Sequence, residues 1–288
     1  MTTWGGPCWA GPQLPSHAHP AQSFAMVPAA DALTRAARLL AGAGKAIVLT
    51  GAGVSTESGI PDFRSATGLW SRYDPAEFAT LGAFLRDPVK VWGLFAELEE
   101  LLDAQPNAGH RALADLERQG ALAGVITQNV DGLHQAAGSR RVVEYHGSHR
   151  TYTCLRCRQR FPGTQVRAMP KVPGTAMPRA PGCAEQAPRG GPPCLLKPDV
   201  VLFDELIPLA AQAEAAELVE QADLILVIGT SCEVYPAAEI PRQVRRAGGR
   251  VVEINLEPAQ DLRPDVLLQG RFSELVPALA QAWHGLKN

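Results

Sequence analysis

Apolar residues along this chain gather in short runs, and between these runs they recur at helical spacing. The runs predict strands over residues 45–50, 122–127, 142–145, 224–228 and 250–254. The helical spacing predicts helices over residues 29–42, 87–103, 107–120, 208–221 and 238–247. Strands that alternate with helices in this way are typical of a parallel α/β sheet.

Polar residues follow the end of each predicted strand. The clusters are Gly51-Ala52-Gly53, Gln128-Asn129-Val130-Asp131, His146-Gly147, Gly229-Thr230-Ser231 and Asn255. In an open parallel sheet the carboxyl ends of the strands form one crevice, which is where such folds bind ligands. The sequence therefore predicts one ligand site built from segments that lie far apart along the chain.

The first of these clusters has the composition of a phosphate cradle. Glycines at positions 51 and 53 allow positive φ and let backbone N–H groups approach a pyrophosphate, and a following helix start would add positive potential. The dinucleotide fingerprint G-x-G-x-x-G is incomplete, because residue 56 is threonine. A tight strand-to-helix turn is the alternative. The segment Gly59-Ile60-Pro61-Asp62-Phe63-Arg64, which comes directly afterwards, favours recognition of a nucleotide.

Two further clusters carry groups suited to chemistry. Gln128, Asn129 and Asp131 offer hydrogen bonds to ribose hydroxyls and a carboxamide, although a turn in which Asn129 and Asp131 bond their own backbone explains them equally well. His146 has the reference pKa of a general base, and its place at the shared crevice favours that role over a structural one. Packing within helices or loops is expected for three other histidines, namely His110, His134 and His149.

A second cradle and a ribose-binding segment are predicted on the later half of the sheet. Gly229-Thr230-Ser231 follows one strand, and Asn255-Leu256-Glu257 follows the next. A simple turn and a strand-end cap are the alternatives at these two places. Cys232 is interpreted as a small buried residue, with a reactive thiol as the less favoured alternative.

Composition and charge narrow the class of protein. Of the 288 residues, 46% are hydrophobic and 19% charged, which suffices for one large domain or two smaller ones. A net charge of −2 provides no field to attract nucleic acid or an anionic membrane. No apolar run approaches the roughly 18 residues of a membrane span, and the N-terminus lacks the pattern of an export signal. We therefore expect a cytoplasmic protein without nucleic-acid or membrane partners.

Two segments lack the periodicity of α/β structure. Residues 1–28 contain five prolines and few large apolar residues, so a disordered extension is expected.

Between residues 150 and 197 prolines accumulate and four cysteines occur. Cys154-x2-Cys157 is a zinc half-site, and Cys183 with Cys194 would be a stretched second half. We expect a small module with little core of its own, stabilised by Zn²⁺.

Together these motifs resemble the sirtuin family, bacterial type. They occur in the family's order and extend over residues 30 to about 284. The residues that carry the resemblance are Gly51-Ala52-Gly53-Val54-Ser55, Gly59-Ile60-Pro61-Asp62-Phe63-Arg64, Thr127-Gln128-Asn129-Val130-Asp131-Gly132-Leu133-His134, Tyr145-His146-Gly147, the cysteine module, Lys197-Pro198-Asp199-Val200-Val201-Leu202-Phe203, Gly229-Thr230-Ser231 and Asn255-Leu256-Glu257-Pro258.

The resemblance implies an α/β fold with a Rossmann-type parallel sheet domain and a smaller inserted domain, made of a helical part and a zinc-ribbon module. Residues 29–60, 104–147 and 198–288 would form the large NAD-binding domain. Residues 61–103 would form the cofactor loop and the helical insertion, and residues 148–197 the zinc-binding module. The structural zinc would be held by four cysteines, namely Cys154, Cys157, Cys183 and Cys194.

By the same resemblance, NAD would lie between the two domains. The phosphates would be approached by Gly51, Ala52 and Gly53. The loop over the nicotinamide ribose would be ordered by Asp62, Phe63 and Arg64. The ribose and the carboxamide would be held by Gln128, Asn129 and Asp131. The adenosine side would be faced by Gly229, Thr230, Ser231, Asn255 and Glu257.

The family's reaction removes an acyl group from a protein lysine. The acyl oxygen attacks the ribose carbon that bears nicotinamide, nicotinamide departs, and an alkylamidate forms. His146, as the base, would then remove a proton from a ribose hydroxyl, and that oxygen would attack the imidate carbon. Water would complete the release of lysine and O-acyl-ADP-ribose. The resemblance implies His146, Asn129 and Arg64 as the catalytic residues.

The substrate peptide would contact Val201, Phe203 and Val234. The run Val200–Phe203 is predicted as a short strand, which either belongs to the core or offers main-chain hydrogen bonds to an extended peptide. Asp204 stands where the family often has glycine, and its side chain would alter how the peptide docks.

The acyl group is predicted to be neutral, such as acetyl. Relatives that take succinyl-lysine or malonyl-lysine carry Tyr-x-x-Arg in the helical insertion, with the arginine pairing with the acyl carboxylate. Counted from Asp87-Pro88, the corresponding positions here are Phe95 and Leu98, and neither side chain binds a carboxylate.

The sequence thus favours an NAD-dependent protein-lysine deacetylase that acts on acetylated proteins or peptides. An ADP-ribosyltransferase or an NAD glycohydrolase would use the same crevice. The three activities differ in the acceptor of ADP-ribose, which is the acyl group, a protein or water. A catalytically silent NAD or ADP-ribose sensor is a third alternative, but a pure binder has no need of a base such as His146. A zinc-ribbon nucleic-acid binder would require a basic stripe with interleaved aromatic residues, which the sequence lacks.

Overall fold

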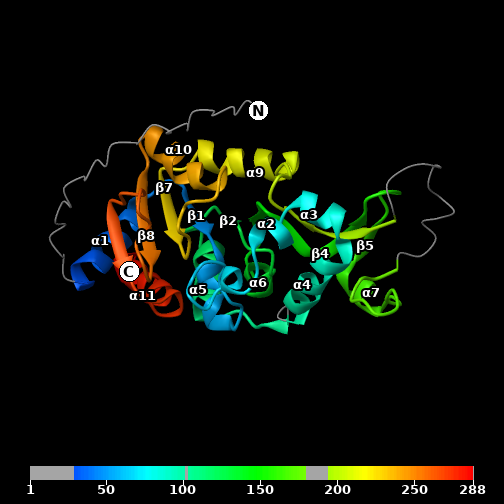
Figure 1. The fold of residues 1–288 in the computed structure, drawn as a ribbon. Helices are drawn as coiled ribbons and strands as arrows, with labels where there is room; N and C mark the ends of the chain where they lie inside the picture. The colour runs from blue at the N-terminus through cyan, green and yellow to red at the C-terminus, as the bar shows by residue number, and fades with distance from the viewer. Residues whose placement is uncertain (1–28, 101–102, 180–193, 288) are drawn as a thin grey trace, which may run out of the picture.

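Two sheets, a large parallel one and a small antiparallel one, form the framework of the computed structural model (Figure 1). The structure describes residues 29–100, 103–179 and 194–287. The predictions for residues 1–28 and for Cys183 lie outside these ranges.

The large sheet is parallel throughout and places its crevice at β1 and β7. The spatial order of its strands is β3-β2-β1-β7-β8-β9. The chain runs outward from β1 to β3 and later places β7 on the opposite side of β1, so the order reverses between β1 and β7. Such a reversal opens a crevice at the carboxyl ends of the strands. The strands are β1 (Ala46–Thr50), β2 (Gly124–Thr127), β3 (Val142–Glu144), β7 (Leu224–Ile228), β8 (Arg250–Asn255) and β9 (Val266–Gln269).

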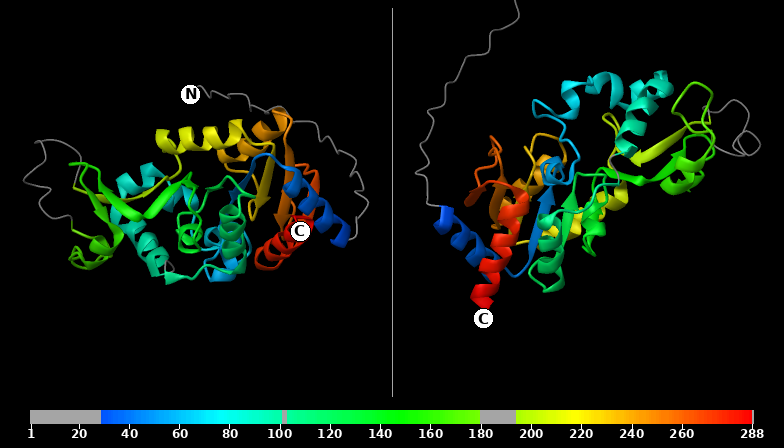
Figure 2. Two further views of the ribbon diagram at one scale, coloured as in Figure 1. Left: turned by 180° about the vertical axis from the view of Figure 1, so that it is seen from behind. Right: turned by 90° about the horizontal axis from the view of Figure 1, so that it is seen from below.

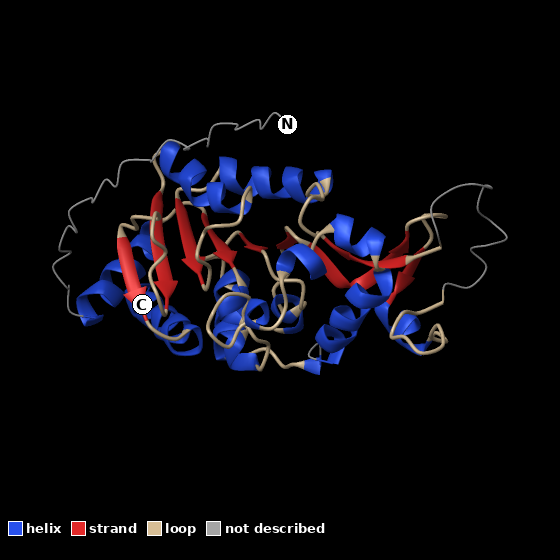
Figure 3. Ribbon diagram, in the orientation of Figure 1, coloured by secondary structure: helices blue, strands red, loops and turns tan. Residues whose placement is uncertain are grey.

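Helices cover both faces of this sheet (Figure 3). α1 (Ala29–Gly42), α5 (Ala108–Arg118) and α11 (Phe272–Lys287) pack on one face, and α9 (Leu209–Glu220) and α10 (Ile240–Arg246) pack on the other. Along β1, Val48 belongs to the first core, whereas Ile47 and Leu49 belong to the second. Because both faces are buried, the strands are mostly apolar, which explains the apolar runs in the sequence.

The small sheet has the order β5-β4-β6 and its own core. Its strands are β4 (Gly147–Cys154), β5 (Arg160–Pro162) and β6 (Leu196–Val200), and α3 (Leu81–Arg86), α4 (Pro88–Glu100) and α7 (Gly163–Ala168) pack around it. Trp92 stacks on Tyr152 with ring centroids 5.7 Å apart, and Trp92 Nε1 donates to Leu196 O. Figure 2 shows this smaller unit beside the large sheet.

Short helices form several connections between these elements. They are the 3-10 helices η1 (Ala52–Val54), η2 (Thr56–Ser58), η3 (Leu69–Ser71) and η5 (Ala237–Glu239), together with α2 (Pro75–Phe78) and α6 (Leu133–Ala136). Within the described ranges, no helix combines the length and the apolar character needed to cross a membrane.

The predicted strand over Val200–Phe203 is wrong. β6 ends at Val200, and Phe203 forms only an isolated bridge with Thr80. Lys197 and Pro198 lie inside β6 instead of before it. Proline is tolerated there because β6 is an edge strand of the small sheet.

Candidate active site

The two glycine-containing clusters pack directly against each other between β1 and β7. Gly51 N donates to Ile228 O at 3.1 Å, and Gly53 N donates to Gly229 O at 2.9 Å. A Cβ atom added to Gly53 would lie 2.9 Å from Gly229 Cα, and one added to Gly51 would lie 2.7 Å from Thr230 Cβ. Glycine is therefore required at positions 51 and 53 because two backbones approach closely.

This packing corrects the expected geometry of the first cradle. Gly51 has a φ of −131°, and Gly53 also lies outside the left-handed region, whereas Gly229 has a φ of 61°. The N–H groups of Gly51 and Gly53 bond within the chain, so they do not point toward a phosphate. The expected helix start is also wrong, because two 3-10 helices, η1 and η2, follow β1 and end at the left-handed Gly59.

The loop after the first cradle is stabilised from within. Asp62 Oδ1 accepts Arg64 N at 3.1 Å and Ser65 N at 2.9 Å. The Phe63 ring packs on Trp70 with centroids 5.2 Å apart, and 37% of Phe63 remains exposed. The aspartate and the aromatic side chain of this motif thus order the loop, and part of the Phe63 side chain stays exposed.

Arg64 extends from this loop to the second cradle. Its Nη1 donates to Ser231 Oγ at 3.3 Å, and its Nε lies 3.4 Å from Glu233 Oε2. About half of each charged side chain is exposed, so water screens the ion pair. The guanidinium group is therefore available to an anionic ligand in this part of the crevice.

Asn129 and Asp131 form one hydrogen-bonded group with the end of β1. Asn129 Nδ2 donates to Gly51 O at 3.1 Å and to Ser55 Oγ at 3.0 Å, and Ser55 Oγ donates to Asp131 Oδ2 at 2.7 Å. Burial raises the pKa of Asp131, although its hydrogen bonds oppose the rise. Ser55 is 1% exposed, and the sequence reasoning gave it no role. Its position inside the Gly51–Ser55 motif was the available signal.

A second buried layer lies beneath this group. Thr50 Oγ1 donates to Thr127 Oγ1 at 2.8 Å and lies 3.0 Å from His134 Nε2. Thr127 Oγ1 also accepts Asn129 N at 3.1 Å. Burial, followed by the nearby charge of His110, lowers the pKa of His134 to about 3, so its ring is neutral at pH 7. His134 therefore supports the position of Asn129 through two threonines, which the sequence reasoning missed.

His146 is anchored by the main chain of the neighbouring strand end. Its Nδ1 lies 3.2 Å from Gln128 O. Because a carbonyl only accepts, Nδ1 carries the proton and Nε2 keeps its lone pair. Burial lowers the pKa of His146, although the bond to Gln128 O opposes this effect, so the neutral ring persists below the usual range. Gln128 Nε2 donates to Thr230 Oγ1 at 2.9 Å and links this strand end to the second cradle.

Asn255 supports the second cradle through its amide group. Asn255 Oδ1 accepts Thr230 N and Asn255 Nδ2 donates to Thr230 O, both at 3.1 Å. Glu253 Oε1 accepts from Asn255 Nδ2 at 2.7 Å and from Ala259 N at 2.6 Å. Glu257 is exposed, as is Ser231. The amide of Asn255 therefore forms its hydrogen bonds with the backbone of Thr230 and with Glu253.

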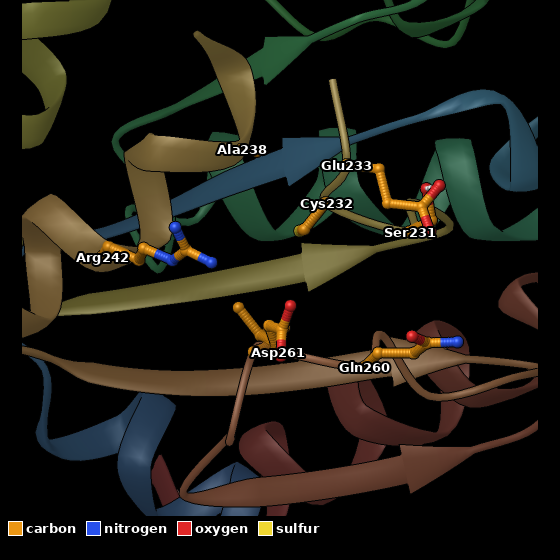
Figure 4. Close-up of a pocket in the computed structure, with 8 residues that line it drawn as sticks. Ser231, Cys232, Glu233, Ala238, Arg242, Gln260 and Asp261 are labelled. Carbon is orange, nitrogen blue, oxygen red and sulfur yellow. Dashed lines mark hydrogen bonds between the residues drawn. The ribbon is translucent and has the colours of Figure 1, made fainter. Parts of the chain in front are cut away.

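A small cavity lies beside the second cradle (Figure 4). Cys232, Glu233, Arg242 and Asp261 are among its lining residues. Burial and the charge of Glu253 raise the pKa of the Cys232 thiol to about 12. The thiol is therefore protonated at pH 7, which favours the interpretation of Cys232 as a packing residue over a reactive one.

The segment after β6 lies next to His146. Val201 N donates to His146 O at 2.8 Å, and Phe203 N donates to Ala79 O at 2.8 Å. Leu202 N donates to Glu205 Oε2 at 2.8 Å. These three N–H groups are thus engaged within the chain, so the segment is not an open edge that offers them to a peptide. Phe203 still exposes 43% of its surface.

Val234, the other predicted peptide contact, lies in the loop after the second cradle. It is half-buried, and its carbonyl accepts Ala238 N at 2.9 Å.

Three of the four predicted zinc ligands lie at the same end of the small sheet. Cys154 N donates to Gln159 O and Cys154 O accepts Arg158 N, both at 2.9 Å, which closes a tight turn around Cys157. Leu155 N donates to Leu195 O at 2.9 Å and brings Cys194 to this turn. Among the described residues, no group of three or more His, Cys, Asp or Glu is placed to hold a metal ion. The fourth predicted ligand, Cys183, lies outside them.

Comparison with known proteins identifies close relatives of this chain. A family profile described as "Sir2 family" matches residues 51–236. An NAD-dependent protein deacylase 2 of Pyrobaculum aerophilum is 48% identical over 248 residues, which cover 85% of this chain and 93% of the relative.

Solved structures show the same fold. A Sir2 homologue in complex with NAD has a TM-score of 0.77 and 40% identity, with 88% of this chain and 94% of that one covered. A Sir2 structure with a deacetylated p53 peptide and 3′-O-acetyl-ADP-ribose has a TM-score of 0.78 and 34% identity, with 86% of this chain and 97% of that one covered.

Proposed function

Because this chain belongs to the Sir2 family, we propose that it is an NAD-dependent protein-lysine deacylase whose preferred acyl group is acetyl. The observation that carries the proposal is the hydrogen-bonded group at the strand ends, in which Gln128 links His146 to the second cradle and Asn129 links β2 to the first. The complexes of relatives with NAD and with acetyl-ADP-ribose support the same activity.

The residues present fit NAD. The absence of side chains at Gly51 and Gly53 lets the two cradles meet at the crevice, and Arg64 offers positive charge beside it. Bound NAD supplies an ADP-ribose group that separates readily from nicotinamide and accepts the acyl group. Asn129 and Asp131 are assigned to ribose hydroxyls, and Arg64 to the pyrophosphate or its ribose.

His146 is assigned as the general base. Its Nδ1–H is held by Gln128 O, so Nε2 is free to take the proton of a ribose hydroxyl. Burial keeps the ring neutral, as a base requires. The remaining site residues orient the reactants and exclude water, which contributes to the rate by proximity.

Phe95 and Leu98 support a neutral acyl group. Phe95 is 2% exposed and packs in the apolar core of the small sheet, edge-on to Trp92 at 5.7 Å between centroids. An apolar side chain at either position offers no positive charge to an acyl carboxylate. The preferred substrate is therefore an acetylated protein or peptide.

A structural Zn²⁺ is also part of the proposal. Thiolates are suitable zinc ligands, and the tight turn at Cys154 and Cys157 together with the neighbouring Cys194 supports a site completed by Cys183. Metal analysis of the purified protein is expected to give one zinc per chain, and chelation is expected to lower its Tm. A metal-free protein with the same Tm would contradict this part of the proposal.

The division into an NAD-binding domain and a small inserted domain stays a proposal, with the boundaries given above. The separate core of the small sheet supports it. A cytoplasmic location is likewise proposed.

Replacement of His146 tests the assigned base. His146→Ala is expected to lower kcat by at least about a hundredfold, as loss of a general base does, with NAD affinity retained. His284→Ala, which removes a histidine in the last turn of α11 that contacts Gln119, serves as the control and should keep full turnover. Wild-type turnover in His146→Ala would refute the assignment.

The acyl preference is tested with matched peptides. Acetyl-lysine peptide is expected to be turned over faster than succinyl-lysine peptide by the wild type, and the double variant F95Y/L98R should gain succinyl turnover. A wild-type preference for succinyl-lysine would refute the assignment.

A further inference from the structure

Lys197 is a buried lysine whose three ammonium protons all have acceptors. The residue is 8% exposed and lies inside the edge strand β6. Its Nζ donates to Pro198 O at 3.1 Å and to Val200 O at 2.7 Å, and it lies 2.9 Å from Glu205 Oε2. An ammonium group has three donors, so this geometry satisfies it fully. The end of β6 and the following turn are thus both held by the ammonium group of Lys197.

Glu205 extends this connection into the turn Leu202–Glu205. The carboxylate oxygen that pairs with Lys197 also accepts Leu202 N at 2.8 Å, and Glu205 N donates to Leu202 O at 3.1 Å. Asp204 lies within the turn with a φ of 68°, a left-handed conformation that disfavours most side chains. The turn therefore needs an external constraint, and the Lys197–Glu205 pair supplies one.

This constraint acts next to His146. Val201 lies between Val200, whose carbonyl binds Lys197, and Leu202, whose N–H binds Glu205. Val201 N itself donates to His146 O at 2.8 Å. A movement of the turn would therefore displace the residue that contacts the main chain of the assigned base.

We propose that the Lys197–Glu205 ion pair is a positioning device for the substrate peptide, because it fixes the Val201–Phe203 segment and the turn after it beside His146. This inference rests on the proposed deacylase function. A buried ion pair contributes little net stability compared with apolar residues of similar volume, because both charges lose their hydration. The proposed role of the Lys197–Glu205 pair is therefore to fix the conformation of the turn, and not to stabilise the fold.

The test compares Michaelis constants for an acetyl-lysine peptide and for NAD. Lys197→Met keeps the length of the stem and removes the charge and its three hydrogen bonds. Its peptide KM is expected to rise about tenfold or more, with the NAD KM changed less than about twofold, because the second cradle is untouched. Lys197→Arg, which restores charge and donors, should return the peptide KM to within about threefold of the wild type.

Arg160→Met is the matched control. Arg160 Nε pairs with Asp199 Oδ2 at 2.7 Å, so this variant removes an ion pair from the same small sheet without touching the turn. Its peptide KM should match the wild type. If Lys197→Met fails to fold, the double variant K197M/E205M leaves no unpaired buried charge, and it should fold and still show the raised peptide KM.

The outcomes separate the inference from the function on which it rests. An unchanged peptide KM in a folded Lys197→Met or K197M/E205M protein would overturn the inference, as would equal increases in the two Michaelis constants. Either result would leave the deacylase function standing. Absence of deacylation by the wild type, with NAD still bound in calorimetry, would remove the proposed function and the inference together.

Discussion

Histidine side chains in this protein differ in burial and in hydrogen bonding. His110, His134 and His149 each have a ring nitrogen with no hydrogen-bond partner among the described residues. Burial lowers their pKa values to about 4, about 3 and about 4, so their rings are neutral at pH 7. His146 is bonded to Gln128 O through Nδ1 at the crevice and keeps Nε2 for chemistry. Its local environment, more than its residue type, suits it to act as a base.

The first prediction concerns the pH dependence of catalysis. Because burial lowers the pKa of His146 from 6.5, the neutral base persists to lower pH than for an exposed histidine. kcat/KM for the acetyl-lysine peptide should therefore fall on the acid side with an inflection below pH 6.5. NAD affinity measured over the same range should stay level. An acid-side inflection above pH 7 would contradict the assigned environment.

The second prediction concerns Thr127, which supports Asn129 from below. Thr127→Val keeps the shape of the side chain but leaves Asn129 N without its acceptor and removes one of the two partners of Thr50 Oγ1, the other being His134 Nε2. An unsatisfied buried donor costs about 1–3 kcal/mol, so we expect lower stability and a fall of about tenfold in kcat/KM for NAD. Thr151→Val also removes hydrogen bonds, to Asp199 and Arg160 in the small sheet. That control should lose stability without a change in the constants for NAD.

At the scale of elements, most strands and long helices follow from the apolar pattern. The continuous runs mark strands buried on both faces, and polar residues do follow each strand. The sequence pattern did not predict β9 or α11, and Pro277 lies inside α11, where proline is normally a signal against a helix. The cradle glycines were identified for the wrong reason. Glycine is needed at positions 51 and 53 because the backbone that follows β7 approaches them closely. The local sequence does not show which strand lies beside β1.

The third prediction concerns the start of α5. Asn107 Oδ1 accepts Gly109 N at 3.0 Å and caps the helix, while Asn107 Nδ2 donates to Val54 O at 2.8 Å. Asn107→Ala should cost about 1–2 kcal/mol as a lost N-cap and should also raise the NAD KM, because η1 loses its support. Asp74→Ala removes the cap of α2 and should leave the NAD KM unchanged. An equal effect of both variants on NAD would contradict the link between α5 and the first cradle.

At the scale of the whole molecule, the site depends on the order of strands in the sheet. The sequence predicts that polar strand ends share one edge, and it does not predict that β7 lies between β1 and β8. That order results from long-range packing of α9 and α10 on one face and α1, α5 and α11 on the other. Lys197 in an edge strand also escaped prediction, because its acceptors come from the folded turn.

The fourth prediction concerns acid stability. His110, His134 and His149 have lowered pKa values in the folded state, so the unfolded chain binds more protons below pH 6.5. As the pH falls from 6.5 to the folded-state pKa of each histidine, that histidine should reduce the unfolding free energy by up to about 1.4 kcal/mol per pH unit. Denaturant unfolding at several pH values measures this slope. His149→Phe should make the slope shallower, and an unchanged slope would contradict the account of this site.

The central claim is that this crevice transfers an acyl group from lysine to ADP-ribose. Mass spectrometry of the products formed from NAD and an acetyl-lysine peptide tests it directly. Equal amounts of nicotinamide, free-lysine peptide and O-acetyl-ADP-ribose are expected from the wild type. His146→Ala is expected to form free-lysine peptide and O-acetyl-ADP-ribose at least about a hundredfold more slowly. Free ADP-ribose with intact acetyl-lysine peptide, or ADP-ribose attached to protein, would contradict it.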